Sequence, residues 1–314
     1  MKTPVAFFIF NRPDVTRRVF DCIAAARPER LLVVGDGPRP THPDDEGRVL
    51  ATRAVIAGVD WPCEVVADFA AANMGCRRRI SSGLSWVFSQ VEEAVILEDD
   101  CLPDPSFFPY CEELLERYRD VPRVMHIAGA NLMKRPLRVR ESYVFSRYAY
   151  IWGWATWRRA WARYDAPMAG LDEGGDGEVL RNVLTSEEER EYWRQHLRLA
   201  KTGVIDTWDY AWLYSCWKAD GLAIVPGVNL VTNIGFGATS THTPDLANRL
   251  ARLPVQAMEL PLRHPVRVAI DDRMRDVDFQ QVFRTPLTLR QRWWRWQARR
   301  RAARIRGPVT SVDG

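Results

Sequence analysis

The stretch Ala94-Val-Ile-Leu-Glu98-Asp99-Asp100 is the most informative segment for the fold. Its four apolar residues predict a strand over 94–97 that is buried on both faces, as in a parallel sheet covered by helices. Three carboxylates follow directly, and open α/β sheets bind their ligands at the carboxyl ends of the strands. Adjacent carboxylates repel one another unless a cation or hydrogen-bond donors compensate, and their oxygens suit Mg²⁺ or Mn²⁺. The stretch therefore predicts a cation site at a strand end, with a solvated acidic turn as the alternative.

Strand and helix signals alternate before this stretch. Short apolar runs predict strands at Val5–Phe10, Leu31–Val34 and Cys63–Ala67. Amphipathic segments predict helices at 15–26, 47–56 and 80–88. This alternation predicts an α/β fold with a mostly parallel mixed sheet and helices on both faces. Asn11 and Arg12 follow the first run and Asp36 the second, so we expect these polar residues to join Glu98–Asp100 at one edge of the sheet.

The pattern changes after residue 120. A strand is predicted over Val124–Ala128, helices over 187–201 and 206–217, and short strands at 224–225 and 229–232. A loop rich in Gly and Thr then spans 233–243. We expect one domain over 1–283, with halves at 1–120 and 121–283, followed by a tail over 284–314.

Composition excludes several classes of protein. The chain has 314 residues, of which 46% are hydrophobic and 27% charged, which is typical of a globular protein. No apolar run approaches the roughly 20 residues that a membrane-spanning helix needs. The first apolar run is followed by Asn11-Arg12-Pro13-Asp14 rather than a cleavage site, so we expect a cytoplasmic protein. Six cysteines without C-x-x-C spacing predict reduced thiols.

The tail differs in charge from the rest of the chain. Residues 284–314 carry nine Arg and one Asp, whereas residues 1–283 have a net charge of −4. Basic segments with Trp residues bind anionic membrane surfaces. We therefore expect 284–314 to bind a membrane peripherally; a helix packing its Trp side chains on the body is the alternative. Nucleic-acid binding is disfavoured, because the basic charge is confined to one tail.

Three further groups of residues have side chains suited to chemistry. In Trp152-Gly-Trp154 a glycine separates two large rings, so a sugar could stack there, although Trp154 is also spaced like a core residue. Asp206 and Asp209 lie at the start of a predicted helix, where one carboxylate would cap the helix and leave the other for general-base work. His242, in the 233–243 loop, is a candidate donor to a diphosphate or a candidate metal ligand, or it is merely structural.

The order of these motifs resembles the GT-A fold nucleotide-sugar glycosyltransferases. The closest likeness is to the N-acetylglucosaminyltransferase I family, which shows Val-Glu-Asp-Asp, a spacer and Pro-Asp-Phe-Phe-Glu-Tyr-Phe. The corresponding segment here is Ile96-Leu-Glu-Asp-Asp-Cys-Leu-Pro-Asp-Pro-Ser-Phe-Phe-Pro-Tyr110. Asn73-Met-Gly-Cys-Arg77 is also similar to the Asn-x-Gly element of family 2 transferases. The likeness runs from about Pro4 to His242.

The resemblance implies a role for each matching residue. Asp100 would coordinate Mn²⁺ or Mg²⁺ bound to the donor diphosphate, with Asp99 near the ribose and Glu98 near the transferred sugar. Donor binding would also involve the residues Asn11, Arg12, Asp36, Asn73 and Arg77, of which Arg12 and Asp36 match residues that contact the base. Asp209 would be the catalytic base. The aromatic residues expected at the acceptor are Trp152, Trp154 and Trp208.

The implied activity is metal-dependent, inverting transfer of a hexosyl or N-acetylhexosaminyl group. The donor would be a nucleotide-diphosphate sugar, with UDP expected as the nucleotide, and the acceptor a glycan or lipid-linked hydroxyl in surface polysaccharide synthesis. Asp36 is followed by Gly-Pro-Arg rather than the family's Cys-Gly, so base recognition is expected to differ. One alternative is a nucleotidyltransferase, although 10–14 contains no glycine for a phosphate loop. The other is an inactive sugar- or nucleotide-binding scaffold.

Overall fold

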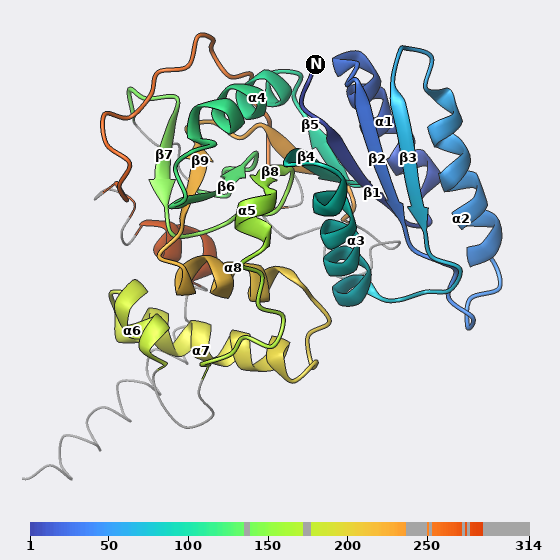
Figure 1. Ribbon diagram of the computed structural model, residues 1–314. Helices are drawn as coiled ribbons and strands as arrows, with labels where there is room; N and C mark the ends of the chain where they lie inside the picture. The colour runs from blue at the N-terminus through green and yellow to red at the C-terminus, as the bar shows by residue number, and fades with distance from the viewer. Residues whose placement is uncertain are drawn as a thin grey trace, which may run out of the picture.

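An eight-stranded mixed sheet forms the centre of the computed structural model, in the order β3-β2-β1-β4-β8-β6-β9-β7 (Figure 1). The structure describes residues 1–134, 139–171, 177–236, 250, 253–271, 274 and 277–284. The sheet strands are β1 (Val5–Ile9), β2 (Arg30–Gly35), β3 (Glu64–Phe69), β4 (Glu93–Glu98), β6 (Val124–Ala128), β7 (Tyr143–Ser146), β8 (Trp154–Trp157) and β9 (Leu222–Pro226). A separate antiparallel pair joins β5 (Cys101–Pro103) to β10 (Val231–Asn233).

The first four strands of this order, β3-β2-β1-β4, are parallel throughout. Helices α1 (Pro13–Ala26) and α4 (Phe107–Tyr118) share a core with one face, and α3 (Cys76–Gln90) packs on the other. Both faces of β1 are buried, which is why its sequence is a continuous apolar run. The predicted mixed α/β sheet with helices on both faces is confirmed. Helix α2 (Asp45–Ala54) packs against α1.

The second half adds antiparallel strands to the same sheet. Strand β8 pairs antiparallel with both β4 and β6, so the sheet is continuous across residue 120. The spacing of Trp154, Trp157 and Trp161 suggests a helix, but 154–157 is a strand, because its backbone is hydrogen-bonded to a strand on each side. Pairing with distant segments overrides local spacing here. Only the short helix α5 (Arg158–Trp161) follows.

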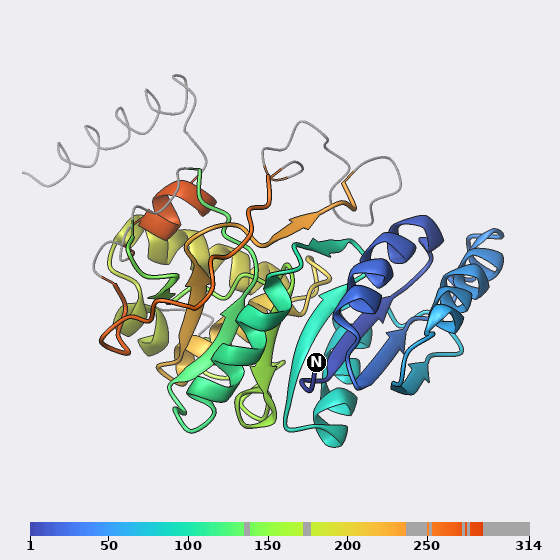
Figure 2. The same cartoon turned by 90° about the horizontal axis from the view of Figure 1, so that it is seen from above.

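Three helices of the second half pack against one another. They are α6 (Glu178–Val183), α7 (Glu187–Lys201) and α8 (Asp209–Lys218). Helix α8 begins three residues later than the sequence predicts, which leaves Asp206, Thr207 and Trp208 in a loop. A π-helical turn at Phe279–Phe283 packs on the same aromatic core as α7 and α8. Figure 2 shows this half beside the parallel strands. No helix among the described residues is long and apolar enough to cross a membrane.

Candidate active site

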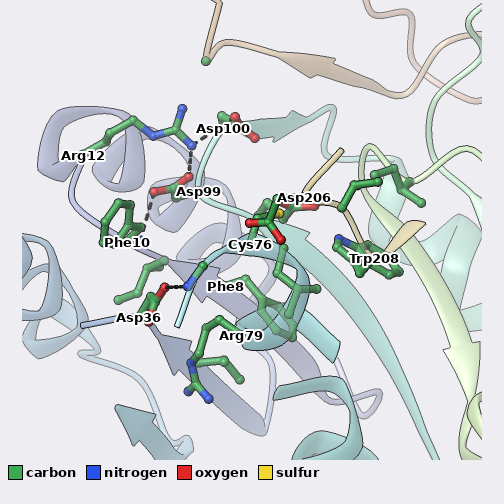
Figure 3. Close-up of a pocket in the computed structure, with 18 of the residues that line it drawn as sticks. Phe8, Phe10, Arg12, Asp36, Cys76, Arg79, Asp99, Asp100, Asp206 and Trp208 are labelled. Carbon is green, nitrogen blue, oxygen red and sulfur yellow. Dashed lines mark hydrogen bonds and ion pairs between the residues drawn. The ribbon is translucent and has the colours of Figure 1, made fainter. Parts of the chain in front are cut away.

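A cavity of about 440 Å³ opens at the carboxyl ends of β1, β2 and β4 (Figure 3). Its lining includes Phe10, Arg12, Asp36, Arg39, Asn73, Cys76 and Glu98–Asp100 from the parallel half of the sheet and its connections. The facing part of the lining comes from Trp152, the loop 206–208 and the segment 233–236. The meeting of polar strand ends that the sequence predicts is therefore present, with the acidic triplet in its wall.

Arg12 compensates the acidic triplet from the start of α1. Its Nη2 lies 3.0 Å from Oδ2 of Asp100 and is also ion-paired with Asp99, which accepts a hydrogen bond from the backbone N of Phe10. Burial lowers the pKa of Arg12, but Asp99 and Asp100 outweigh this and hold the pKa above its ordinary value. The guanidinium is thus charged and bridges two carboxylates.

Negative charge still exceeds positive charge beside Arg12. Burial, followed by the charges of Asp100, Asp99 and Asp209, raises the pKa of Glu98 to about 8. Repulsion of this kind is relieved by a bound cation. The acidic triplet therefore provides an electrostatic environment that favours cation binding.

The segment 233–236 covers the Arg12–Asp100 pair. Ile234 donates its backbone N–H to the carbonyl of Asp100 at 2.8 Å. A Cβ on Gly235 would overlap Oδ2 of Asp100 and lie 2.6 Å from Nη1 of Arg12, so only glycine fits here without movement. The Phe236 ring packs edge-on against Trp152, with centroids 5.7 Å apart.

At the end of β2, Asp36 is held by the loop that precedes α3. Its Oδ1 accepts the backbone N–H groups of Gly37 (2.8 Å) and Met74 (2.9 Å), and its Oδ2 accepts Nδ2 of Asn73 (2.9 Å) and the N–H of Gly75 (3.2 Å). Gly75 has a φ of +78°, which glycine tolerates best, and α3 begins directly after it. Asp36 and Asn73 both reach the cavity, as the sequence predicts.

Two predicted donor-binding residues do not line the cavity. Asn11 donates from Nδ2 to the buried Asp45 at 2.8 Å. Arg77 donates to the carbonyls of Ala200 (2.9 Å) and Ala166 (3.2 Å), which ties α3 to the second half. Direct donor contact is therefore not supported for Asn11 or Arg77, because neighbouring residues at a strand end or helix start point in different directions.

The loop before α8 carries the carboxylate that faces the cavity. Asp206 lines the cavity with Thr207 and Trp208, and its Oδ2 would be 3.1 Å from a Cβ on Gly75. Asp209 is the first residue of α8 and accepts a hydrogen bond from Oγ1 of Thr207. Its charge contributes to the raised pKa of Glu98, so it lies within electrostatic reach of the acidic triplet.

The three predicted acceptor tryptophans have different environments. Trp154 has 0% exposure and stacks between His126 (4.9 Å) and Trp208 (5.6 Å), so the prediction that it offers a ring to a sugar is wrong. Trp208 is 2% exposed but forms part of the cavity lining, and the half-buried Trp152 lines it too. His242 lies outside the described residues, as does nearly all of the tail.

The carboxylates in the cavity wall suit a cation site that a substrate completes. Within the described part of the chain, no group of three or more His, Cys, Asp and Glu side chains could hold a metal ion. Magnesium sites that act on nucleotides commonly use one or two carboxylates, water and the substrate's phosphates. Asp100 and Glu98, beside an excess of negative charge, fit such a site.

Several residues that line the cavity were not among the predicted site residues. Among them are Phe10, Arg39, Cys76 and Gly235. Phe10 ends the predicted strand Val5–Phe10 and Gly235 lies in the predicted loop 233–243, so their positions were a usable signal. Arg39 carried no such signal, because its placement depends on its contacts with Asp45 and Phe10.

The sequence matches no protein family and no curated protein. Distant similarities to solved structures exist. The galactosyltransferase LgtC, in complex with donor and acceptor sugar analogues, is 13% identical, with a TM-score of 0.40 over 82% of this chain and 85% of that one. The mannosyltransferase PcManGT from Pyrobaculum calidifontis, in complex with GDP-Man and Mn²⁺, is 15% identical, with a TM-score of 0.38 over 70% and 74%. 4-Diphosphocytidyl-2C-methyl-D-erythritol synthase from Anaerococcus prevotii is 11% identical, with a TM-score of 0.35 over 63% and 99%.

Proposed function

We propose that this protein is a metal-dependent, inverting glycosyltransferase of the GT-A type, acting on a nucleotide-diphosphate sugar. One observation carries the proposal: a single cavity has the triplet Glu98–Asp100 in its wall together with the carboxylate Asp206 and the ring of Trp152. The triplet suits a cation and a diphosphate. The carboxylate and ring suit an acceptor hydroxyl and its sugar.

The proposed roles follow from these positions. Asp100 would hold Mn²⁺ or Mg²⁺, which neutralises the charge that develops on the leaving diphosphate. Arg12, which already binds two carboxylates, would bind phosphate oxygens. Asp209, or Asp206, whose carboxylate lines the cavity, would accept the proton of the acceptor hydroxyl. A single displacement with one base inverts the anomeric centre.

Two other functions predict different products. A nucleotidyltransferase would release pyrophosphate from a nucleoside triphosphate, and an inactive scaffold would bind nucleotides without releasing any product. The test is to incubate the full chain with Mn²⁺ and a panel of UDP-, GDP-, CDP- and dTDP-sugars, and to measure nucleoside diphosphate release with and without added glycan acceptors. Release that Asp100→Ala abolishes supports the proposal. Pyrophosphate release from a triphosphate, or binding without release, contradicts it.

We also propose that the acceptor is lipid-linked and that the enzyme works at the cytoplasmic face of a membrane. The support is the sequence of 284–314, which is basic and rich in Trp. Co-sedimentation with anionic liposomes should be lost when residues 289–314 are deleted. Retention of binding by the truncated chain would contradict this part of the proposal.

A further inference from the structure

The Asp36 carboxylate has no acceptor capacity left for a ligand. Its two oxygens accept four hydrogen bonds, from the backbone and side chain of 73–75 and from the N–H of Gly37. An ionised carboxylate offers about four lone-pair sites. Three of the four attach the loop 73–75 to the end of β2 and the fourth is used by Gly37, so the Asp36 carboxylate keeps no free acceptor site for a base N–H.

Arg39 lies in the same part of the cavity and is held in a fixed orientation. Its Nε and Nη2 donate to the two carboxylate oxygens of Asp45 at 2.6 and 2.9 Å. Asp45 is 3% exposed and also accepts from Asn11, and its contact with Arg39 lowers its pKa. The Arg39 side chain is 33% exposed, and no described residue accepts a hydrogen bond from its Nη1. A planar cation with free donor capacity thus lines the cavity.

Phe10 supplies an aromatic ring beside this cation. The Cζ of Arg39 lies 5.4 Å from the centroid of the Phe10 ring, and both residues line the cavity. The backbone N of Phe10 donates to Asp99, and Figure 3 shows the ring between Asp36 and the Arg12–Asp99 pair. An aromatic ring and a planar guanidinium are the side chains on which bases stack. They line the same cavity as the acidic triplet, so a nucleotide whose diphosphate lies at the triplet can reach them with its base.

We propose that Phe10 and Arg39 bind the donor's nucleobase and select it, whereas Asp36 is a positioning residue that holds the loop 73–75. This inference rests on the proposed function. Nη1 of Arg39 donates to a base carbonyl oxygen, so the site takes the nucleoside diphosphates of uracil, thymine, cytosine or guanine in preference to that of adenine, which has no carbonyl. Asn11 contributes indirectly, by fixing the Asp45 carboxylate that orients Arg39.

Calorimetric titration of the full chain with Mn²⁺ tests the Phe10–Arg39 part. The probes are UDP, dTDP, GDP, CDP, ADP and inorganic pyrophosphate. One variant is Phe10→Leu. The other combines Arg39→Gln with Asp45→Asn, so that neither charge is left buried without its partner. Each variant should weaken the binding of the nucleotide that the wild type binds best about tenfold and leave pyrophosphate binding unchanged. An equal loss of pyrophosphate affinity in the variants, or tighter binding of ADP than of the other nucleotides by the wild type, overturns the inference. If the wild type binds pyrophosphate and nucleotides and the variants bind both normally, the inference fails while the proposed function stands. If the wild type binds neither, both fail.

Asp36→Asn tests the role of the carboxylate itself. A carboxylate that reads uracil N3–H would, as an amide, present an N–H to the N3 acceptor of cytosine, and the preference would move from UDP to CDP. The positioning role predicts instead that all nucleotides weaken together and that the ratio of UDP to CDP affinity is kept. A reversal in favour of CDP would overturn it. The thermal midpoint of each variant serves as the folding control.

Discussion

Nη2 of Arg12 lies 3.0 Å from Oδ2 of Asp100, at the position where a cation would neutralise that carboxylate. The same nitrogen is ion-paired with Asp99, and the backbone of Gly235 covers the pair. Arg12 is therefore the counter-ion of the acidic triplet in this structure. If Asp100 holds a divalent cation as proposed, that cation would be repelled by Arg12 unless a bound diphosphate compensated both positive charges.

Arg12→Gln should therefore raise the affinity for Mn²⁺ in the absence of nucleotide and weaken the binding of nucleoside diphosphates. Two charges about 4 Å apart interact by roughly 1–4 kcal/mol between bulk water and a protein surface, so a change of about tenfold in each direction is expected. Electron paramagnetic resonance of free Mn²⁺ measures the first effect and calorimetry the second. Arg18→Gln, the same charge change on an exposed residue of α1, is the control. An unchanged Mn²⁺ affinity would contradict the counter-ion role.

Asp209→Asn should reduce sugar transfer by at least about 100-fold while nucleotide binding is kept, because a general base contributes 10²–10⁴-fold to such reactions. Asp206→Asn is the matched variant, since it removes the carboxylate that faces the cavity three residues earlier. The measurement is kcat with the donor in excess, beside the dissociation constant for the nucleoside diphosphate. A full loss of turnover in Asp206→Asn, together with near-normal turnover in Asp209→Asn, would identify Asp206 as the catalytic base instead.

Gly235→Ala should disrupt the cover over the acidic triplet. The added Cβ overlaps Asp100, so either the segment 233–236 or the Arg12–Asp100 pair must move, at a cost of about 1–3 kcal/mol in the free energy of unfolding. The rise in thermal midpoint caused by Mn²⁺ and nucleotide should shrink as well. Gly47→Ala is the control, because nothing lies within 4 Å of its Cβ position in α2, and it should be neutral or slightly stabilising. Equal behaviour of the two variants would count against this cover.

His126 should make the protein less stable in mild acid. His126 is fully buried. Its Nε2 donates to the carbonyl of Tyr150 at 2.9 Å, and its Nδ1 accepts from Nε1 of Trp212 at 3.2 Å. Both ring nitrogens are therefore already hydrogen-bonded in the neutral form, and a second proton on Nδ1 would face the N–H of Trp212. Burial lowers its pKa to about 4, against the ordinary 6.5 of the unfolded chain. The unfolded state therefore binds the proton first, and stability is lost as the pH falls from about 6.5 to about 4.

The size of this effect is about 3 kcal/mol at most, from 1.36 kcal/mol for each pKa unit. Urea unfolding of the wild type and of His126→Gln between pH 4 and pH 7 measures it. The free energy of unfolding should depend less on pH in the variant across this range. The same slope in both proteins would show that other groups cause the acid sensitivity.

Local sequence predicted the parallel half of the fold well. The apolar runs before Asn11, Asp36 and Glu98 are strands β1, β2 and β4, because a strand buried on both faces needs consecutive apolar residues. Helix α4 and strand β7 were not predicted, although both are largely buried. Strand β8 has the spacing of a helix and is a strand only because β4 and β6 pair with it.

Local sequence was sufficient to predict that Arg12, Asp36 and Asp100 each follow a strand and that the carboxyl ends of these strands share one edge of the sheet, since parallel strands align their carboxyl ends. Which neighbouring side chain faces the cavity depends on the tertiary structure: Arg12 rather than Asn11, Cys76 rather than Arg77, and Asp206 beside Trp208. Tertiary structure also decided that Trp154 is core and that Gly235 covers Asp100. Side-chain direction depends on contacts between segments far apart in the chain, whereas an apolar run indicates only that its own residues are buried.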